Sequence, residues 1–298
     1  MIRIVAGQAG QRADKLVAEE FPNRGRKRLA GLFANGHVRV NGHKAKKGQL
    51  LAAGDVVELE QAPPDDNDLR PVPELAPIEV LHEDADIVCA SKPPGVPSHP
   101  LRAGERGTLA NAIVARFPEC RLAGDDPREG GLVNRLDTGT SGIIVAARSP
   151  GAWRAVRDLF HRGHVTKDYL ALVHGCLGDA GTIDEPVWHR GDRMVIHARG
   201  LPAVTHYEPQ ERFSSHTLVR CISTTGRMDQ IRVHLAHLGH PLVGDVLYGA
   251  SRNDLPVIGH FLHAKTICLP LERKDLRIEA PLPEDRRRAL EILRSQRR

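Results

Sequence analysis

A polar loop that leads into an apolar run constrains this chain more than any other stretch. Residues 132–147 read LVNRLDTGTSGIIVAA. Asp137 lies close to Arg135, and Gly139 and Gly142 permit tight turns of the backbone. The β-branched run that follows predicts a buried strand. Because reactive groups usually lie on loops held by a rigid scaffold, the stretch predicts a reactive carboxylate anchored by a central strand. A structural Asp in a turn is the alternative.

The composition is that of a globular protein. The chain has 298 residues, of which 41% are hydrophobic and 27% charged, enough for one large domain and a smaller one. Five scattered cysteines form no Cys-x-x-Cys pair, which argues against a disulfide framework and a thiolate zinc site. No segment approaches the roughly 18 apolar residues of a membrane span, and the first residues lack the apolar region of a signal peptide. We expect a soluble cytoplasmic protein with no membrane partner.

Positive charge is concentrated in the first part of the chain. The net charge is +5, and residues 1–62 carry 11 Lys and Arg against 6 Asp and Glu, so the remainder is balanced. Eight basic residues and no acidic residue occur from Arg24 to Lys47. Such an excess is typical of a nucleic-acid-binding surface, although a solvated basic face is the alternative. The candidate contacts here are Arg24, Arg26, Lys27, Arg28 and Arg39.

The first 62 residues predict a small α/β module. Helical spacing is present in 11–21 and in the basic stretch 26–33. Residues 37–42 alternate apolar and polar side chains before an Asn-Gly pair, which is a strong hairpin signal. Residues 54–59 predict a closing strand. Two short helices and a small sheet are therefore expected.

A proline-rich segment separates this module from the rest. Residues 63–77 contain prolines and an acidic cluster, a composition typical of a semi-extended linker, so the second domain is predicted at 78–298. Its predicted helices lie at 108–117, 149–163, 230–238 and from 283 onward. Its predicted strands lie at 86–90, in the apolar segment that follows Gly142, at 165–173 and within 182–224. The arginines of the last helix, Arg286 among them, are expected to face solvent or nucleic acid.

Three other chemical interpretations fit parts of the sequence. His234, His237 and His240 invite a zinc site, but the third lies beyond Gly239, a predicted helix end, and no acidic helper fits the known spacings. We therefore expect no metal. Residues 139–142 lack the spacing of the Gly-x-Ser-x-Gly hydrolase elbow.

Asp137-Thr138-Gly139 also spells the signature of an aspartic protease. Such an enzyme needs two carboxylates that share one proton. The chain has no second Asp-Thr-Gly or Asp-Ser-Gly, so a homodimer would have to supply it. Arg135 would also oppose the raised carboxyl pKa that a shared proton requires. A dimeric aspartic protease is thus a distant alternative.

Several segments follow one known pattern in order. They are NRLDTGTSGIIVAA, DIVCASKPPGVPSHP, GTLANAIVARFPE, VTKDYLALVHG, TGRMDQIRVHLAHLGHPLVGDVLYG and LHA. Together they resemble the RluA-type pseudouridine synthases. Residues 1–62, with HVRVNG and GDVVEL, resemble the RNA-binding domain named after small-subunit ribosomal protein S-four. The resemblance implies an α+β fold with a mixed, mostly antiparallel central sheet, flanking helices and a catalytic cleft.

The resemblance also implies an activity. An enzyme of this kind is an isomerase that converts uridine to pseudouridine in structured RNA. Large-subunit ribosomal RNA is the expected partner because the S-four-type module accompanies that branch of the family, and transfer RNA stays open. We expect a monomer that needs no metal, nucleotide or redox cofactor. A non-catalytic RNA-binding protein on the same fold is the main alternative, and the presence of Asp137, Tyr169 and Arg232 favours the enzyme.

The resemblance assigns roles to single residues. Asp137 works on the nucleoside, by attack on the base, attack on the sugar or proton transfer, and Arg232 is the cation that keeps it ionised. Tyr169 stacks on the flipped uracil and can handle a proton. Arg135 fills the gap left by the flipped base or contacts the RNA backbone. The remaining predicted RNA contacts in this domain are Lys92, His99 and Arg227.

The chain departs from the family pattern at two places. Asn134 stands where the family usually has His, and Met228-Asp229 where it usually has Thr-His. Asp229 brings a negative charge three residues from Arg232. We expect this charge either to alter RNA contact or to weaken the pairing of Arg232 with Asp137.

Overall fold

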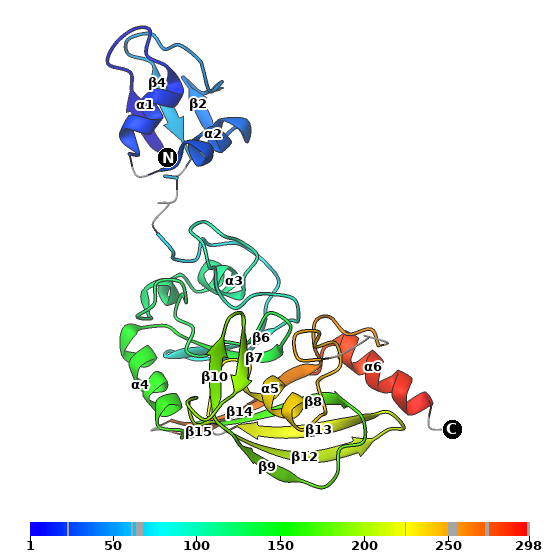
Figure 1. Ribbon diagram of the computed structural model, residues 1–298. Helices are drawn as coiled ribbons and strands as arrows, with labels where there is room; N and C mark the ends of the chain where they lie inside the picture. Colours follow the sequence, from blue (N-terminus) through cyan, green and yellow to red (C-terminus); the bar gives the residue numbers. More distant parts are fainter. Residues whose placement is uncertain are drawn as a thin grey trace. The chain divides into compact units, whose positions relative to one another are not determined.

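The computed structural model divides the chain into two compact units (Figure 1). It describes residues 1–22, 24–60, 62–63, 68–223, 225–249, 255–271 and 274–296, without the side chains of 26–28 and 274. The first unit comprises Met1–Val72 with Leu101–Glu105, and the second comprises Pro73–Pro100 with Arg106–Arg298. The chain thus passes from one unit to the other inside the predicted linker, residues 63–77. The prediction did not include the grouping of Leu101–Glu105 with the first unit.

The first unit is a four-stranded sheet with two helices. Its strands have the order β1-β4-β2-β3. Asn41 and Gly42 have positive φ angles of 49° and 79°, as an Asn-Gly hairpin turn requires, and the predicted hairpin is confirmed. The elements are β1 Ile2–Val5, α1 Ala13–Glu20, α2 Arg26–Ala34, β2 Val38–Val40, β3 His43–Lys44 and β4 Val56–Leu59.

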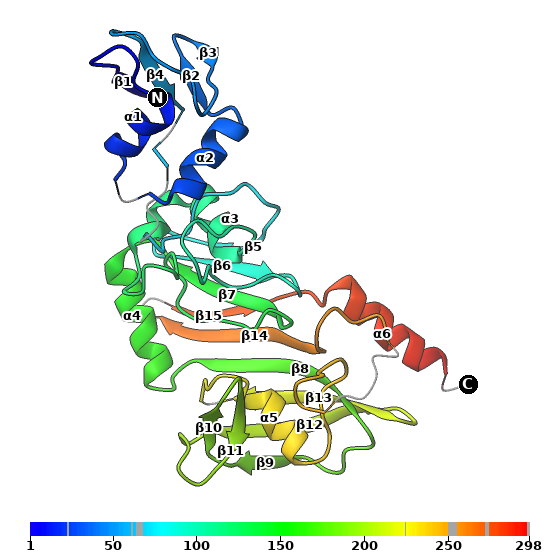
Figure 2. The same ribbon diagram turned by 45° about the horizontal axis from the view of Figure 1, so that its top comes forward.

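The second unit is built on one large sheet. The strands have the order β5-β6-β7-β14-β8-β13-β12-β9, and β15 pairs with β14 (Figure 2). Among the described strands of this sheet every pairing is antiparallel except that of β7 with β14. The predicted α+β class with a mixed, mostly antiparallel sheet is confirmed. The strands are β5 Glu79–Glu83, β6 Ile87–Lys92, β7 Ser141–Ala147, β8 Thr166–His174, β9 Gly181–Asp184, β12 Val204–Arg212, β13 His216–Ser223, β14 Leu262–Leu271 and β15 Lys274–Glu279.

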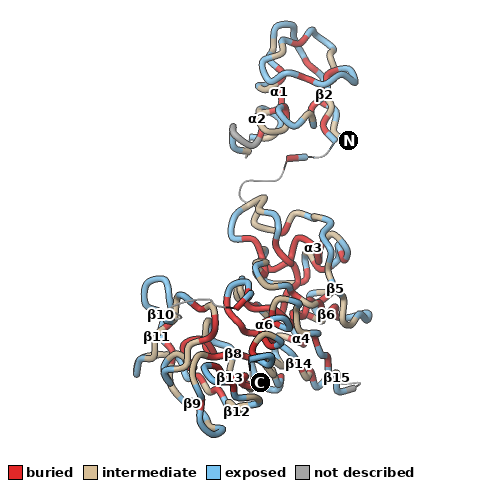
Figure 3. The backbone as a smooth tube through the Cα atoms, turned by 90° about the vertical axis from the view of Figure 1, so that its right-hand side faces the viewer, coloured by how far each residue is buried: buried red, intermediate tan, exposed pale blue. Residues whose placement is uncertain are grey.

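The remaining elements of the second unit surround this sheet. A separate hairpin, β10 with β11, lies beside α5. Figure 3 shows buried segments through the middle of the unit and exposed segments mainly at its loops. The elements are α3 Leu109–Arg116, the 3-10 helix η1 Pro118–Leu122, α4 Pro150–His161, β10 Val187–Arg190, β11 Arg193–Ile196, α5 Gln230–His237 and α6 Glu284–Ser295.

Strand β7 is buried along its whole length because helices cover both of its faces. Its residues 143, 145 and 147 pack in the core that contains Trp153 of α4, whereas 144 and 146 pack in the core that contains Ile113 of α3. This explains the unbroken apolar run, since a strand buried on both faces does not alternate. Both helices begin as predicted: the side chains of Thr108 and Ser149 cap α3 and α4.

The parallel pairing of β7 with β14 depends on a glycine. Gly142 lies opposite Ala264 and has a φ of 116°, and a Cβ at this position would lie 2.2 Å from the Ala264 carbonyl oxygen. Only glycine permits so close an approach. The loop that carries Asp137 therefore joins the sheet at a position, residue 142, where only glycine fits.

Candidate active site

Asp137 lies on the loop that immediately precedes β7. Its side chain is 33% exposed. Within the loop the Thr140 amide donates to the Asp137 carbonyl oxygen at 3.0 Å, which closes a tight turn. A Cβ on Gly139 would lie 2.9 Å from Nδ1 of His260, so this glycine lets the loop pack against the segment before β14. The carboxylate is thus presented on a fixed turn.

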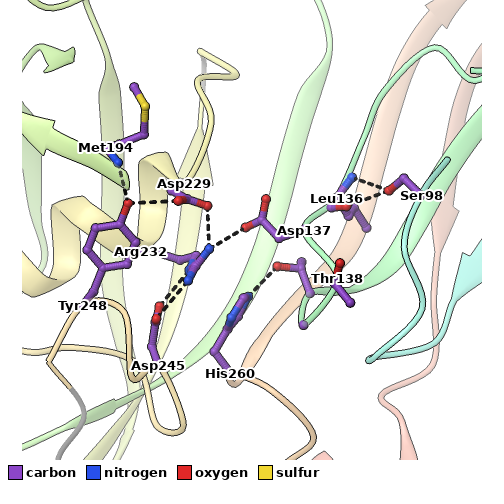
Figure 4. Close-up of polar contacts among 12 residues, drawn as sticks. Ser98, Leu136, Asp137, Thr138, Met194, Asp229, Arg232, Asp245, Tyr248 and His260 are labelled. Atoms are coloured by element: carbon purple, nitrogen blue, oxygen red, sulfur yellow. Dashed lines mark hydrogen bonds and ion pairs between the residues drawn. The ribbon is translucent and has the colours of Figure 1, made fainter. Parts of the chain in front are cut away.

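Two side chains tie the loop to its surroundings. Ser98 Oγ donates to the Leu136 carbonyl oxygen at 2.6 Å and accepts from the Leu136 amide at 3.1 Å (Figure 4). Asn134 Nδ2 donates to the Ile143 carbonyl oxygen at 3.3 Å, and Asn134 Oδ1 accepts from the Val145 amide at 2.8 Å. Asn134, one of the two departures from the family pattern, therefore fastens the loop to β7.

Lys92, at the end of β6, anchors the same loop. The prediction that it contacts RNA is wrong. The side chain is completely buried at the end of β6. Its Nζ donates to three carbonyl oxygens, those of Pro93 at 3.0 Å, Val96 at 2.6 Å and Thr138 at 3.1 Å. These bonds occupy all three donors of the ammonium group. Burial lowers the pKa of Lys92 to about 7.

Arg286 of α6 is a second buried anchor, and the expectation that it faces solvent or RNA is also wrong. None of the residue is exposed. Its Nη2 donates to the carbonyl oxygens of Gly139 at 2.7 Å and His260 at 2.8 Å, and its Nη1 pairs with Asp285 at 2.8 Å. The loop is therefore held by charged side chains from β6 and α6.

Three carboxylates converge on Arg232 of α5 (Figure 4). Asp245 accepts from Nε at 2.7 Å and from Nη2 at 2.9 Å. Nη1 donates to Asp229 at 2.5 Å and to Asp137 at 3.3 Å. The Arg232 side chain is 10% exposed and that of Asp245 only 1% exposed, so these bonds are shielded from water. The structure thus brings together Asp137 and Arg232, which the sequence analysis paired.

The charges around Asp137 decide its protonation. Burial, followed by the charge of Asp229 and opposed by Arg232, raises the pKa of Asp137 to about 6. Burial lowers the pKa of Arg232, whereas its bonds to Asp245 and the charges of the other carboxylates raise it. The raising effects are larger together, so the pKa of Arg232 is raised overall. Arg232 is therefore always charged, and Asp137 is mostly ionised at neutral pH.

Tyr248 completes the cluster from the segment that follows α5. Its hydroxyl donates to Asp229 Oδ2 at 2.9 Å and accepts from the Met194 amide at 2.9 Å. Its ring centre lies 5.0 Å from Cζ of Arg232, within the range of a cation–π contact. The ring and hydroxyl therefore contact both partners of the Asp229–Arg232 pair.

Tyr169 lies on β8, where it pairs with Cys221 of β13 and Ala264 of β14. It is half-buried and packs against apolar cores on both sides. Burial and the charge of Asp137 both raise the pKa of its phenol. Tyr169 is therefore a neutral phenol within electrostatic reach of Asp137.

Two predicted RNA contacts in this unit are exposed. Arg135 lies on the Asp137 loop, with Nη1 3.5 Å from Nε2 of His99. His99 itself is buried, so its ring contacts Arg135 rather than open solvent. Arg227 is exposed ahead of α5 and donates to the Pro202 carbonyl oxygen at 3.1 Å. Arg135 and Arg227 are thus accessible to an RNA.

The predicted contacts in the first unit differ in exposure. Arg24 is half-buried and donates to the Pro63 carbonyl oxygen at 2.8 Å. Arg39 is exposed on β2 and donates to the Gly42 carbonyl oxygen at 3.1 Å. The side chains of Arg26, Lys27 and Arg28 lie outside the described part of the chain.

Sequence reasoning missed Asp245 and Tyr248. Both lie in GDVLYG, a segment quoted for its resemblance without a role for either residue. A signal was available for Asp245, because it sits in an apolar stretch and a buried carboxylate needs a cation. No comparable signal marked Tyr248, whose role depends on contacts between distant segments.

Two of the three histidines that could suggest a zinc site have separate partners. His234 is buried and lies within hydrogen-bond distance of Thr205 Oγ1 and the Glu185 carbonyl oxygen. His240 lies 2.9 Å from the His174 carbonyl oxygen. Within the described residues, no group of three His, Cys, Asp or Glu is placed to hold a metal ion. No described helix is both long and apolar enough to span a bilayer.

Known proteins share this fold and these motifs. A family model described as RNA pseudouridylate synthase matches residues 86–237. Ribosomal large subunit pseudouridine synthase D of Xanthomonas campestris is 37% identical over 96% of this chain and 90% of its own length. The protein of the same name in Escherichia coli K12 is 34% identical, over 97% of this chain and 92% of its own.

A solved structure agrees with these matches. The human RNA pseudouridylate synthase domain containing 4 has a TM-score of 0.58 and 26% identity, covering 72% of this chain and 92% of that chain. The fold and motifs thus define an RNA-modifying enzyme. The chain belongs to the RNA pseudouridylate synthase family. It is an isomerase that converts uridine in RNA to pseudouridine.

Proposed function

We propose that this synthase modifies uridines of large-subunit ribosomal RNA and that Asp137 is the carboxylate that acts on the target nucleoside. The names of its relatives support the choice of RNA, since those aligned along nearly their whole length are ribosomal large subunit enzymes. The basic first unit supports the same choice, because a folded RNA is recognised largely through its backbone and shape.

One observation carries the role of Asp137. Its carboxylate lies 3.3 Å from a buried guanidinium, on a loop whose carbonyl groups are held by Ser98, Lys92 and Arg286. A group held this firmly keeps its orientation when a substrate arrives. The exposed third of the side chain leaves room for contact with a nucleoside.

The reaction sets the demands on these residues. The bond between sugar C1′ and base N1 breaks, the uracil turns, C1′ bonds to C5, C5 loses its proton, and N1 gains a proton, so the product is an isomer of the substrate. Asp137 is mostly ionised at pH 7, as nucleophilic or general-base work requires. Arg232 holds the carboxylate in position without removing its charge.

Tyr169 and Arg135 serve the flipped nucleotide in this proposal. The raised pKa of Tyr169 keeps its phenol protonated at neutral pH, which favours stacking on the uracil over service as a resting base. Arg135 is exposed on the loop that carries Asp137, where its guanidinium can fill the space that the base vacates. The first unit, in its resemblance to the S-four-type domain, contributes sequence-independent RNA affinity.

The test is a reaction with purified components. Large-subunit ribosomal RNA transcript and unmodified transfer RNA are incubated separately with wild-type protein and with Asp137→Asn, and pseudouridine is mapped in each. We expect modification of discrete uridines in the ribosomal transcript by wild-type protein only. Modification confined to transfer RNA would contradict the substrate assignment, and an active Asp137→Asn would contradict the role of Asp137.

A further inference from the structure

One nitrogen of Arg232 serves two carboxylates. Asp245 takes the Nε and Nη2 edge of the guanidinium, which leaves Nη1 for Asp137. Asp229 also binds Nη1, at 2.5 Å, whereas Asp137 lies at 3.3 Å. The carboxylate placed at the reacting centre thus has the longest contact of the three, and Asp229 has the shortest.

The backbone and Tyr248 hold Asp229 in this position. Asp229 is the residue that precedes α5, with a φ of 52° in the left-handed region, which Asp and Asn tolerate better than most residues. Asp at this position usually caps the helix with its side chain, but here the side chain makes no capping bond. It binds Arg232 and accepts from the Tyr248 hydroxyl instead. The carboxylate is therefore diverted from helix capping to the active site.

The neighbours of Asp137 make the pairing sensitive to Asp229. One guanidinium is shared by three carboxylates, and Asp229 lies at the one nitrogen that Asp137 also uses. Titratable or charged groups face Asp137 from every element around it. At α5 and in the segment after it they are Arg232, Asp229, Asp245 and Tyr248. On the other elements and on the loop itself they are Tyr169 of β8, Lys92 of β6, His260 before β14, Arg286 of α6 and Arg135. Of the groups bound to Arg232 Nη1, only Asp229 competes with Asp137.

We propose that Asp229 is a positioning residue for Asp137: it draws Arg232 away from the reacting carboxylate, with Tyr248 holding it in that place. The inference rests on the proposed function of Asp137. A more weakly paired carboxylate is more basic and a better nucleophile, and it ionises at a higher pH.

The test is the pH dependence of single-turnover rates for Asp229→Asn on ribosomal RNA. Asn keeps one oxygen that accepts the bond from Nη1, tolerates the left-handed backbone and removes the charge, while its Nδ2 takes the place of the oxygen that accepts from the Tyr248 hydroxyl. We expect the midpoint of the acid limb to fall by roughly one pH unit, because a neighbouring like charge has been removed. At pH 8 we expect a rate lower by about threefold, since the carboxylate becomes less basic. A purely structural role for Asp229 would lower the rate at every pH and leave the midpoint in place, which would overturn the proposal.

A matched variant controls for the loss of one negative charge. Asp158 lies on the exposed face of α4, where it pairs with Arg162 at 2.9 Å, and Asp158→Asn should leave the midpoint unchanged. A shift of equal size in this variant would overturn the proposal. Asp137→Asn separates the two hypotheses: if it is inactive while Asp229→Asn keeps the wild-type midpoint, only the positioning role fails. If Asp137→Asn is active, the proposed function itself fails.

A second measurement needs no substitution at Asp229. Carboxyl-13C resonances of the wild-type protein are titrated, and Asp137 is assigned by its absence in Asp137→Asn. We expect Asp137 to titrate at about 6. Titration near the ordinary aspartate value of roughly 4 would overturn the proposal, because burial and the charge of Asp229 together would then leave the pKa of Asp137 unraised.

Discussion

Arg232 and Asp245 form a two-bond ion pair that is almost completely shielded from water. Nε lies 2.7 Å from one carboxylate oxygen and Nη2 lies 2.9 Å from the other. Parallel bonds of this kind fix the plane of the guanidinium as well as its position. The direction in which Nη1 points toward Asp137 is therefore set by Asp245, a residue that has no contact with Asp137 among the hydrogen bonds described.

Replacing Arg232 by Lys should cost both stability and activity. Lysine keeps the charge but cannot reproduce the fork that binds Asp245, which leaves a buried carboxylate poorly paired. We expect a loss of roughly 2–4 kcal/mol in the free energy of unfolding, together with a large fall in kcat. Urea unfolding of Arg232→Lys, Asp245→Asn and the double variant gives the coupling between the two sites. We expect the two losses to be strongly non-additive, and simple additivity would contradict the pairing.

The carboxyl group of Asp137 should destabilise the folded protein at neutral pH. It ionises near 3.8 when unfolded and at about 6 when folded, so the folded state binds more protons between these values. Its contribution to stability therefore decreases as the pH rises from about 4 to about 6. At pH 7 the free energy of unfolding of Asp137→Asn should exceed that of wild type by roughly 1–2 kcal/mol, after allowance for screening of a partly exposed side chain. The gain should shrink at pH 4, and a gain that grows at low pH would contradict this account.

Lys92 and Arg135 should show opposite effects when substituted. Lys92→Met removes the ammonium donor from three carbonyl oxygens, of which that of Thr138 keeps a bond from the Gly95 amide. We therefore expect a loss of roughly 2–4 kcal/mol in unfolding free energy and a lower kcat. Arg135→Ala removes an exposed side chain, so stability should change by less than about 0.5 kcal/mol while RNA binding weakens. Thermal unfolding and RNA titration of both variants check this. Weaker RNA binding with intact stability in Lys92→Met would revive the original prediction for that lysine.

Gly142 should be the least replaceable glycine near the site. An alanine there would place its Cβ 2.2 Å from the Ala264 carbonyl oxygen and strain the backbone, so we expect a loss above roughly 3 kcal/mol or failure to fold. Gly107 also has a positive φ, of 77°, but its Cβ would have open space, so Gly107→Ala should cost only about 1 kcal/mol. Chemical unfolding compares the two. Equal costs would mean that backbone strain alone explains the Gly142 effect.

Much of the fold follows from local patterns. The Asn41-Gly42 turn, the caps Thr108 and Ser149 and the buried strand β7 could be predicted because each depends on residues close in sequence. Strand β14 could not be placed in the same way. Its parallel pairing with β7 joins segments about 120 residues apart, and nothing local in either strand specifies that partner.

The site was partly predictable for the same reason. Asp137 and Arg232 lie in motifs from which their roles could be predicted. Lys92 and Arg286 were predicted to be exposed, because lysine and arginine usually are, whereas both are buried anchors. Their burial could be explained only from the structure, which shows that the carbonyl groups of the loop that carries Asp137 take their donors from these two side chains. The competition between Asp229 and Asp137 for one nitrogen required the geometry, although the charge of Asp229 was visible in the sequence.

The most direct test of the central claim is pseudouridine mapping of total RNA from cells that lack this protein, complemented with wild type or with Asp137→Ala. We predict that discrete uridines of large-subunit ribosomal RNA lose modification and that only wild type restores them. Loss of no site, or restoration by Asp137→Ala, would contradict the account.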